Sequence, residues 1–304
     1  MSNKDNDRNQ NQSTLMDQEQ ALAIQEQAAT NSATQALATY TPTINLPVLA
    51  DQQTALEVIS ENLDGMGDFK FDKIDMPGSG GITFTVIDEE GVERPVQEIK
   101  GIVLDKFPFK RWYAKSFEDK DADDIGIPDC FSADNVHGSG FSVEGKVIIP
   151  AGQLCADCDR GQWGSDRKGG RGKDCADKIR FHILQEGNVF PVYIDTPPTS
   201  LANFKDYVKR LANKLLPFYG VVTVVGLERD KSGGGISYSK LTFKKAADLT
   251  GGERAAIKAY IAQLLPSMRS ITRESIGEVA VGNVGAEMVE PGADVEGRGG
   301  AEIY

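Results

Sequence analysis

The sequence predicts a mainly β protein with two or three helices, built as an antiparallel barrel that carries an inserted cysteine-rich module. Three observations support this fold class. Short apolar–polar alternations separated by Gly and Asp turns recur between residues 68 and 243. One stretch with helical apolar spacing interrupts them, at residues 197–215. All four cysteines of the 304-residue chain fall within residues 130–175.

The ends of the chain differ in composition from the middle. Residues 1–50 are rich in Asn, Gln, Ser, Thr and Ala, and we interpret them as a disordered, low-complexity tail because they have too few apolar side chains to bury a core. Residues 51–270 are expected to form the folded domain, which begins with a helix at residues 52–63. Residues 277–304 form an acidic, Gly-rich C-terminal tail.

Strand patterns follow one another through the domain. They lie at residues 69–74, 80–87, 97–104, 143–149, 179–184, 189–194, 221–229 and 236–243. The third pattern continues into an aromatic stretch at residues 107–113. The helix at residues 197–215 begins with Pro-Pro-Thr-Ser, and a last helix at residues 252–265 is expected to stop at Pro266. Short strands with one mid-chain helix are compatible with an oligonucleotide-binding (OB) barrel, and a plain β-sandwich fits the strand number nearly as well.

The cysteine spacing is typical of a structural zinc site. Cys130, Cys155, Cys158 and Cys175 are separated by 24, 2 and 16 residues. The C-x-x-C pair can occupy one tight turn and present both sulfurs to one ion, while the other two cysteines arrive from separate strands or loops. We therefore expect these four thiolates to hold a structural zinc ion within a module at residues 128–178.

Other uses of the cysteines depend on the compartment. No apolar run reaches the ~18 residues that a membrane span needs, and the chain begins without a secretory apolar core. We therefore expect a cytoplasmic protein with no membrane contact. In a reducing cytoplasm structural disulfides are rare, which favours a metal over disulfides or redox chemistry. Buried free thiols remain an alternative, and His137 could replace one cysteine ligand.

The charge is unevenly distributed along this acidic chain, whose net charge is −12. Residues 1–100 carry 6 Lys and Arg against 17 Asp and Glu, a net of −11. Residues 151–250 carry 16 Lys and Arg against 11 Asp and Glu, a net of +5. Global acidity argues against indiscriminate polyanion binding, but the basic block that holds most of the cysteines permits a polyanion groove.

Residues 106–117 interleave aromatic and cationic side chains, as single-stranded nucleic-acid sites do. In such sites bases stack on exposed aromatic faces while cations follow the phosphates. The predicted contacts in this stretch are Phe109, Lys110, Arg111, Trp112, Tyr113 and Lys115. The same alternation also fits an ordinary strand whose aromatic residues face the core and whose cations face solvent.

The Gly-rich loop after the C-x-x-C pair supplies a second set of predicted contacts. These are Trp163, Arg167, Lys168, Arg171 and Lys173. Five glycines between residues 161 and 172 would let the backbone approach a ligand closely. The alternative is that Trp163 packs against the cysteine module and the cations only keep the loop soluble.

Several of these motifs resemble proteins carried by bacteriophages and integrative elements of bacteria, some of which look like single-stranded DNA-binding proteins. The resemblance covers roughly residues 80–250. It includes the Gln-Trp-Gly-Ser of residues 162–165, and its specific parts are the four-cysteine pattern and the Pro-Pro-Thr-Ser helix start. The predicted architecture of the chain is also similar to that of phage replication proteins that combine an OB-type barrel, a zinc module and an acidic C-terminal tail. This chain ends in Ile303-Tyr304, but its tail has fewer acidic residues and more glycine.

The leading hypothesis is a non-enzymatic single-stranded DNA-binding protein of a phage or mobile element, acting in DNA replication or recombination in the cytoplasm of a bacterial host. The resemblance implies that the C-terminal tail recruits replication or recombination proteins. One alternative is a zinc-stabilised scaffold for protein–protein interaction. A second is a metal-dependent nuclease, which needs about three carboxylates or histidines in one cleft. Nothing in the sequence resembles a catalytic triad, and a zinc ion with four thiolate ligands has no open position for water.

Overall fold

The fold is described from a computed structural model. It describes residues 43–64, 70–88, 90–115, 126–141, 147–167, 169–232, 235–273 and 275–276. Contacts divide the chain into residues 1–43 and residues 44–304, and every element named below belongs to the second unit. The predicted C-terminal tail and most of the predicted N-terminal tail lie outside the described residues.

The described elements are mainly strands, as the sequence predicts. In chain order they are α2 (Pro47–Ala50), α3 (Gln52–Leu63), β1 (Phe84–Ile87), β2 (Glu93–Val96), β3 (Glu98–Trp112), β4 (Cys130–Ser132), β5 (His137–Phe141), β6 (Val147–Leu154), η2 (Cys155–Asp157), η3 (Asp159–Gly161), β7 (Ala176–Gln185), β8 (Val192–Thr196), η4 (Pro198–Ser200), α4 (Leu201–Ala212), η5 (Phe218–Gly220), β9 (Val221–Lys231), β10 (Ser237–Asp248) and α5 (Gly251–Met268).

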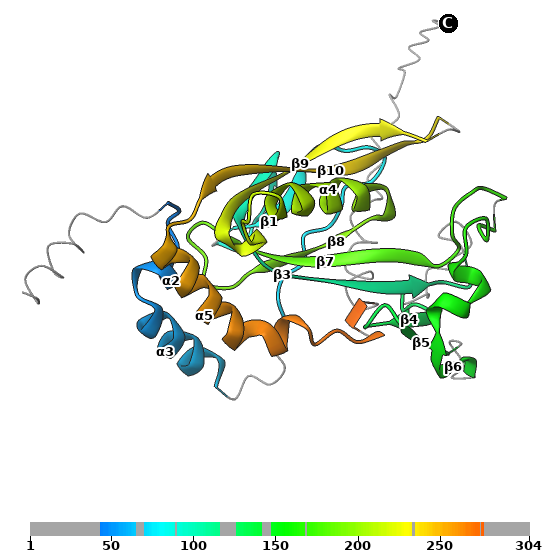
Figure 1. Ribbon diagram of the computed structural model, residues 1–304, viewed down its shortest axis with the longest axis horizontal. Helices are drawn as coiled ribbons and strands as arrows, with labels where there is room; N and C mark the ends of the chain where they lie inside the picture. Colours follow the sequence, from blue (N-terminus) through cyan, green and yellow to red (C-terminus); the bar gives the residue numbers. More distant parts are fainter. Residues whose placement is uncertain are drawn as a thin grey trace, which may run out of the picture. The chain divides into compact units, whose positions relative to one another are not determined.

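The long strand β3 organises an eight-stranded antiparallel sheet (Figure 1). It pairs with β7 along residues 101–111, with β9 near its start and with β4 at its end. β10 lies beyond β9, β8 beyond β7, and β5 and β6 beyond β4, while β1 and β2 form a separate two-stranded sheet. Among the described strands this order does not return on itself, so the predicted OB-like barrel is not confirmed.

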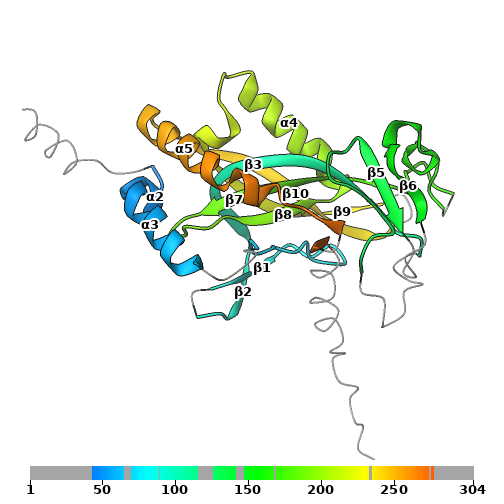
Figure 2. The ribbon, with the colours of Figure 1, turned by 90° about the horizontal axis from the view of Figure 1, so that it is seen from below.

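Alternation along β3 sends its side chains into different hydrophobic clusters. Ile102 and Leu104 join residues of α2 and α5, whereas Val103 joins the cluster that contains the apolar side of α4. A β-bulge between Val103 and Asp105 shifts the register against β7. Figure 2 shows α4 on one side of the sheet and the β1–β2 hairpin on the other.

A third cluster covers the end of β3. Phe107 and Phe109 pack with Phe131 of β4 and with Ile271 and Ile276, which follow α5. The chain after α5 therefore lies over the aromatic residues on one side of β3.

Two predicted boundaries are wrong. Composition predicts a disordered tail up to residue 50, but Ile44, Leu46 and Val48 are at most 2% exposed and belong to the core. Pro47 stands at the first position of α2, where its missing N–H costs no hydrogen bond. Pro266 does not end the last helix: α5 continues to Met268, because a proline this close to the C-terminal end interrupts little of the helix that follows.

Candidate metal centre and nucleic-acid interface

The four cysteines come together where β3 ends. Cys130 opens β4 and pairs with Trp112, the last residue of β3. Cys155 begins the single turn η2, and Cys158 follows that turn directly. Cys175 immediately precedes β7, which runs beside β3. Cys130 and Cys175 are far apart in the sequence, and the pairing of β4 and β7 with the two edges of β3 brings them together.

Backbone hydrogen bonds fix the loops that carry these cysteines. The Cys155 N–H donates to the Val136 carbonyl at 2.8 Å, and the Cys175 N–H donates to the Arg160 carbonyl at 2.8 Å. These two bonds tie the C-x-x-C turn to the loop before β5, and η3 to the residue that precedes β7. The main chain therefore braces the module.

One cavity of about 20 Å³ has all four cysteines in its lining. This volume suits a single water-sized occupant. Gly138 lies on the wall, and a Cβ atom there would be 3.4 Å from the Cys130 Sγ and 3.6 Å from the Cys155 Sγ. The absence of a side chain at Gly138 thus leaves room beside two of the sulfurs. Four thiols around one ion-sized space are a donor set that fits zinc.

The thiols converge without forming a closed ligand cage. Among the described residues, no three His, Cys, Asp or Glu side chains are already grouped so as to hold a metal ion. Burial, reinforced by the neighbouring cysteines, raises the pKa of Cys130 to about 11. Burial likewise raises the pKa of Cys175 to about 12. Binding a metal here would require side-chain rotation and release of thiol protons, as zinc–thiolate sites do.

His137 is placed differently from the cysteines. It is exposed, its Nδ1 lies 2.7 Å from the Asp134 Oδ2, and it is absent from the cavity lining. Asp134 also accepts the backbone N–H groups of Val136 and His137, and these hydrogen bonds lower the pKa of its carboxyl. The imidazole therefore belongs to a surface turn, and the structure offers no support for it as a replacement ligand.

The aromatic residues of β3 are covered. Phe109 is 0% exposed and Trp112 is 7% exposed. The Trp112 indole N–H donates to the Asp174 carboxylate at 2.6 Å, and the Arg160 guanidinium lies 4.2 Å from its ring centre. Neither ring face is open, so the prediction that Phe109 and Trp112 stack on bases does not fit the structure. The chain after α5 covers Phe109, and the cysteine module covers Trp112.

Several predicted phosphate-binding cations are paired with carboxylates. Lys110 and Lys173 both contact Asp177, with the Lys173 Nζ at 2.9 Å from Oδ2. Burial opposes ionisation of Asp177, but hydrogen bonds from the two lysines lower its pKa overall. Arg167 donates to Asp174 at 2.6 Å and also to the carbonyl groups of Tyr113 and Ala114. These contacts tie the loop to the end of β3.

Trp163 is the exposed aromatic residue of the module. Its side chain is 80% exposed, and the Lys173 Nζ lies 5.1 Å from its ring centre. Arg171 is exposed nearby in the chain, and Lys168 lies outside the described residues. The loop therefore presents an open indole beside a cation, although most of its other cations are engaged.

Of the remaining predicted contacts, Arg111 lies on the side of β3 opposite to Lys110 and Trp112. Arg111 is half-buried with its guanidinium 5.5 Å from the Tyr113 ring centre, and Lys115 is exposed. Burial raises the pKa of Tyr113. The predicted site residues are therefore divided between the two sides of β3. Phe109 and Arg111 are on the side of Phe107, while Lys110 and Trp112 are on the side of the cysteine module. Strand alternation makes this division unavoidable.

A buried ion pair that the sequence did not predict lies beside this region. Arg180 donates to Asp195 at 2.7 and 2.9 Å, and its guanidinium lies 3.9 Å from the Tyr193 ring centre. Lys178 lies nearby, and burial, followed by repulsion from Arg111, lowers its pKa to about 7. The alternation of cations with apolar residues in β7 was the available signal, but it predicted only a strand.

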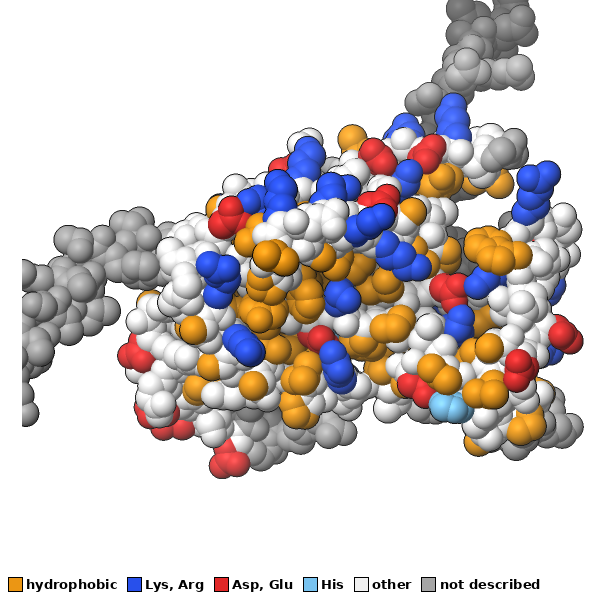
Figure 3. Space-filling model, in the orientation of Figure 1, with side chains coloured by type: hydrophobic (Ala, Val, Ile, Leu, Met, Phe, Trp, Pro, Cys, Tyr) orange, Lys and Arg blue, Asp and Glu red, His pale blue; other side chains and the backbone are white. Residues whose placement is uncertain are grey.

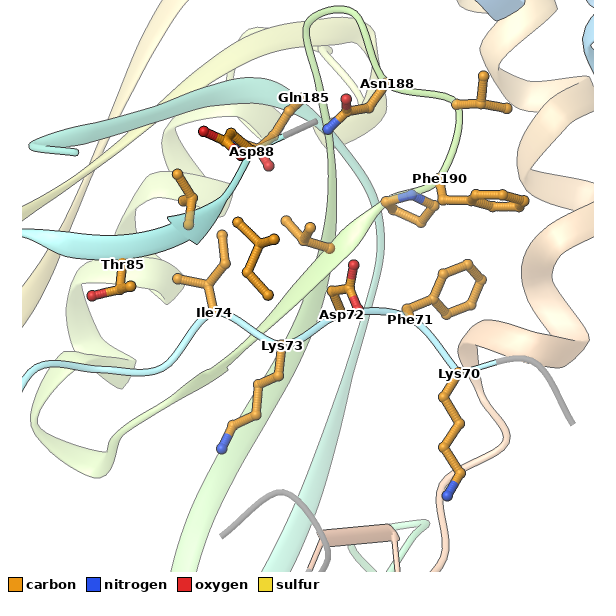
Figure 4. Close-up of a pocket in the computed structure, with 15 residues that line it drawn as sticks. Lys70, Phe71, Asp72, Lys73, Ile74, Thr85, Asp88, Gln185, Asn188 and Phe190 are labelled. Atoms are coloured by element: carbon orange, nitrogen blue, oxygen red, sulfur yellow. The ribbon is translucent and has the colours of Figure 1, made fainter. Parts of the chain in front are cut away.

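A second, larger cavity lies away from the cysteines. It measures about 360 Å³ and is lined by residues 70–74, 85–88, 185 and 188–192. In Figure 4 the side chains of Lys70 and Lys73 extend away from its centre, whereas Asp72 points inward. None of the predicted site residues lines it.

Comparisons with known proteins add no relative: no family model, curated protein or solved structure matches this chain. Within the described ranges, the helices include none that is long and apolar enough to cross a membrane.

Proposed function

We propose that this protein binds single-stranded DNA without catalysing a reaction on it, as a replication or recombination protein of a phage or mobile element. The observation that carries the proposal is Trp163, an 80% exposed indole on a braced, glycine-rich loop beside Lys173. Base stacking uses an open ring face and tolerates any sequence.

We also propose that Cys130, Cys155, Cys158 and Cys175 hold one structural zinc ion. Their shared cavity and the open space at Gly138 support this assignment. A bound zinc would supply the cross-link that fixes the two loops beside β3, and four thiolates would leave it no position for a substrate. The role of the residues is then to orient Trp163. The proposal does not require a closed OB-like barrel, because the module projects from the end of an open sheet.

The DNA-binding test is a titration of zinc-loaded protein with oligo-dT and with duplex of equal length, at two salt concentrations. We expect binding to oligo-dT that weakens as salt rises, and much weaker binding to duplex. Trp163→Ala should weaken oligo-dT binding about 5- to 150-fold, as expected for losing one stacked base worth about 1–3 kcal/mol. Trp163→Phe, which keeps a ring face, is the matched control. Absence of oligo-dT binding at low salt refutes the function.

The zinc proposal has its own test. Protein purified without oxygen should contain one zinc ion per chain, and Cys155→Ser should lower both the zinc content and the melting temperature. Structural zinc can contribute about 10 kcal/mol or more to folding. Arg171→Gln, at an exposed residue of the same loop that does not line the cavity, is the matched control and should leave both unchanged. A metal-free wild-type protein that melts at the same temperature with and without added zinc overturns the assignment.

A protein-interaction scaffold is the second candidate, and the burial of Trp112 favours it. An open tryptophan is also a frequent anchor of protein interfaces, and the pairing of Lys110, Arg167 and Lys173 with carboxylates reduces the charge free for phosphates. If Trp163 serves a protein partner, Trp163→Ala leaves any oligo-dT binding unchanged. The nuclease alternative gains nothing, because the described residues group no three carboxylates or histidines.

A further inference from the structure

Unpaired positive charge is concentrated on α4, a helix that the predicted site did not include. Lys205, Lys209, Arg210 and Lys214 are all exposed on this helix or just after it. In the described part of the chain none of the four has an ion pair, and only Arg210 has a ring contact, to Tyr207 at 5.9 Å. Figure 3 shows Lys and Arg side chains gathered over the part of the molecule formed by α4, β9 and β10.

The opposite stripe of α4 is fixed firmly to the sheet. Phe204, Tyr207 and Leu211 are at most 4% exposed, and Phe204 stacks on Phe181 of β7 with ring centres 5.4 Å apart. The Pro-Pro-Thr-Ser start has a structural role here. Ser200 accepts the Leu241 N–H at 2.9 Å, and Asn203 donates to the Leu241 carbonyl at 2.8 Å. These two hydrogen bonds pair the Leu241 N–H and carbonyl on the free edge of β10, and they fix the start of α4 against the sheet.

The same side of β3 connects α4 to the cysteine module. Lys106 is opposite Phe181 in the register with β7, and its Nζ lies 5.5 Å from the Phe218 ring centre. Alternation places Pro108 and Lys110 on this side as well, and Pro108 is exposed. Trp112 shares this alternation, so the cysteine module that covers it lies on this side of β3, and Figure 2 shows α4 on one side of the sheet.

We propose that the outer face of α4 is a second phosphate-binding element of the single-stranded DNA site. One strand of DNA would stack at Trp163, cross β3 over Lys106 and Pro108, and reach Lys205 and Lys209. This inference rests on the proposed function and specifies its extent. The positive charge of this face complements the negative charge of DNA. Exposed lysines without ion-pair partners attract the phosphates of a single DNA strand whose bases stack at Trp163.

The test compares matched variants of the zinc-loaded full chain on short and long oligo-dT, about 8 and about 30 nucleotides, chosen around the usual site sizes. The double variant Lys205→Gln/Lys209→Gln removes two contacts. On long oligo-dT the slope of log affinity against log salt should become shallower by about 1.4, or about 0.7 per lost phosphate contact. Lys258→Gln, an exposed lysine on α5, is the control that should leave the slope unchanged.

The outcomes separate this inference from the function beneath it. Affinity for short oligo-dT should fall with Trp163→Ala and stay within twofold of wild type in the α4 variant. If the α4 variant matches Lys258→Gln in slope and affinity on long oligo-dT while Trp163→Ala weakens binding, the α4 inference is wrong and the function stands. If wild-type protein binds neither oligonucleotide, both are wrong.

Discussion

The buried histidine His182 should make the fold sensitive to mild acid. It is 2% exposed, and its ring lies among Phe71, Phe107 and Tyr193. Its Nδ1 has no hydrogen-bond partner in the described part of the chain. Burial, followed by the positive charge of Arg180, lowers the pKa to about 4 from the usual 6.5, and the negative charges of Asp105, which is opposite His182 in the strand register, and Asp195 compensate only in part.

The sign and size of the effect follow from proton linkage. Because the pKa is lower in the folded state, the unfolded chain binds the extra proton first, and stability is lost as pH falls from about 6.5 towards 4. A shift of about 2.5 units corresponds to about 3 kcal/mol in full, and about 2 kcal/mol of this is lost between pH 7 and pH 4.5. Carboxyl groups with lowered pKa values act mainly below this window.

Urea denaturation of wild type and His182→Gln at pH 7, 5.5 and 4.5 measures the effect. Glutamine has no proton to gain, so the variant should lose about 2 kcal/mol less than wild type over this range, even if it is less stable at pH 7. Acid would also displace any zinc bound by the cysteine thiolates, but it would do so in both proteins, and the difference isolates His182. Parallel pH profiles for the two proteins would refute the reasoning.

Three further substitutions test what holds the sheet together. Arg180→Leu should destabilise the fold by about 3–5 kcal/mol in urea denaturation, because it leaves the buried Asp195 carboxylate without its partner. The double variant Arg180→Leu/Asp195→Leu should recover much of that loss, and no recovery would contradict the pairing. Ser200→Ala should cost about 1–3 kcal/mol by leaving the buried Leu241 N–H without an acceptor, whereas Ser270→Ala, at an exposed serine, should be neutral within about 0.5 kcal/mol. Gly101→Ala should cost at least about 1–3 kcal/mol because its Cβ would lie 2.2 Å from the Leu184 carbonyl oxygen of β7, while Gly252→Ala, which meets open space, should have little effect or stabilise α5; equal melting temperatures for the two alanine variants would contradict this packing.

The sequence predicted the strand that matters but not what covers it. Strand alternation puts Phe107, Phe109 and Arg111 on one side of β3 and Lys110 and Trp112 on the other. Alternation shows which residues share a face of the strand, but it carries no information about which distant segment packs on each face. Ile271 and Ile276, more than 150 residues later in the chain, close over Phe109. Exposure of the aromatic residues could not be read from their own neighbourhood.

Composition misled the prediction at residues 44–50 for a related reason. The polar composition of residues 1–50 suggested a disordered tail, yet Ile44, Leu46 and Val48 fill a core site beside α5. Three apolar residues at a spacing of two are too few to distinguish a buried segment from a tail without knowing that α5 offers them a partner. The cysteine spacing was more informative. It predicted convergence of four distant residues, and they do line one cavity, while the metal itself stays a prediction.

Charge within the cysteine module leads to a last prediction, which separates stacking from phosphate binding. Residues 155–178 contain six cations and five carboxylates, 6 − 5 = +1. The cations are Arg160, Arg167, Lys168, Arg171, Lys173 and Lys178, and the carboxylates are Asp157, Asp159, Asp166, Asp174 and Asp177. A zinc ion with four thiolates adds a further −2, so the loaded module has a net charge of about −1. Such a module attracts phosphates weakly, and its contribution must come from the indole face.

Trp163→Ala should therefore weaken oligo-dT binding by a similar factor at every salt concentration, because stacking releases no counterions. The α4 variant Lys205→Gln/Lys209→Gln should do the reverse, with a loss that is large at low salt and shrinks as salt rises. Titrations at four salt concentrations distinguish a parallel displacement from a change in slope. A shallower slope for Trp163→Ala would mean that the module cations contact phosphates directly, and that their carboxylate partners give them up when DNA binds.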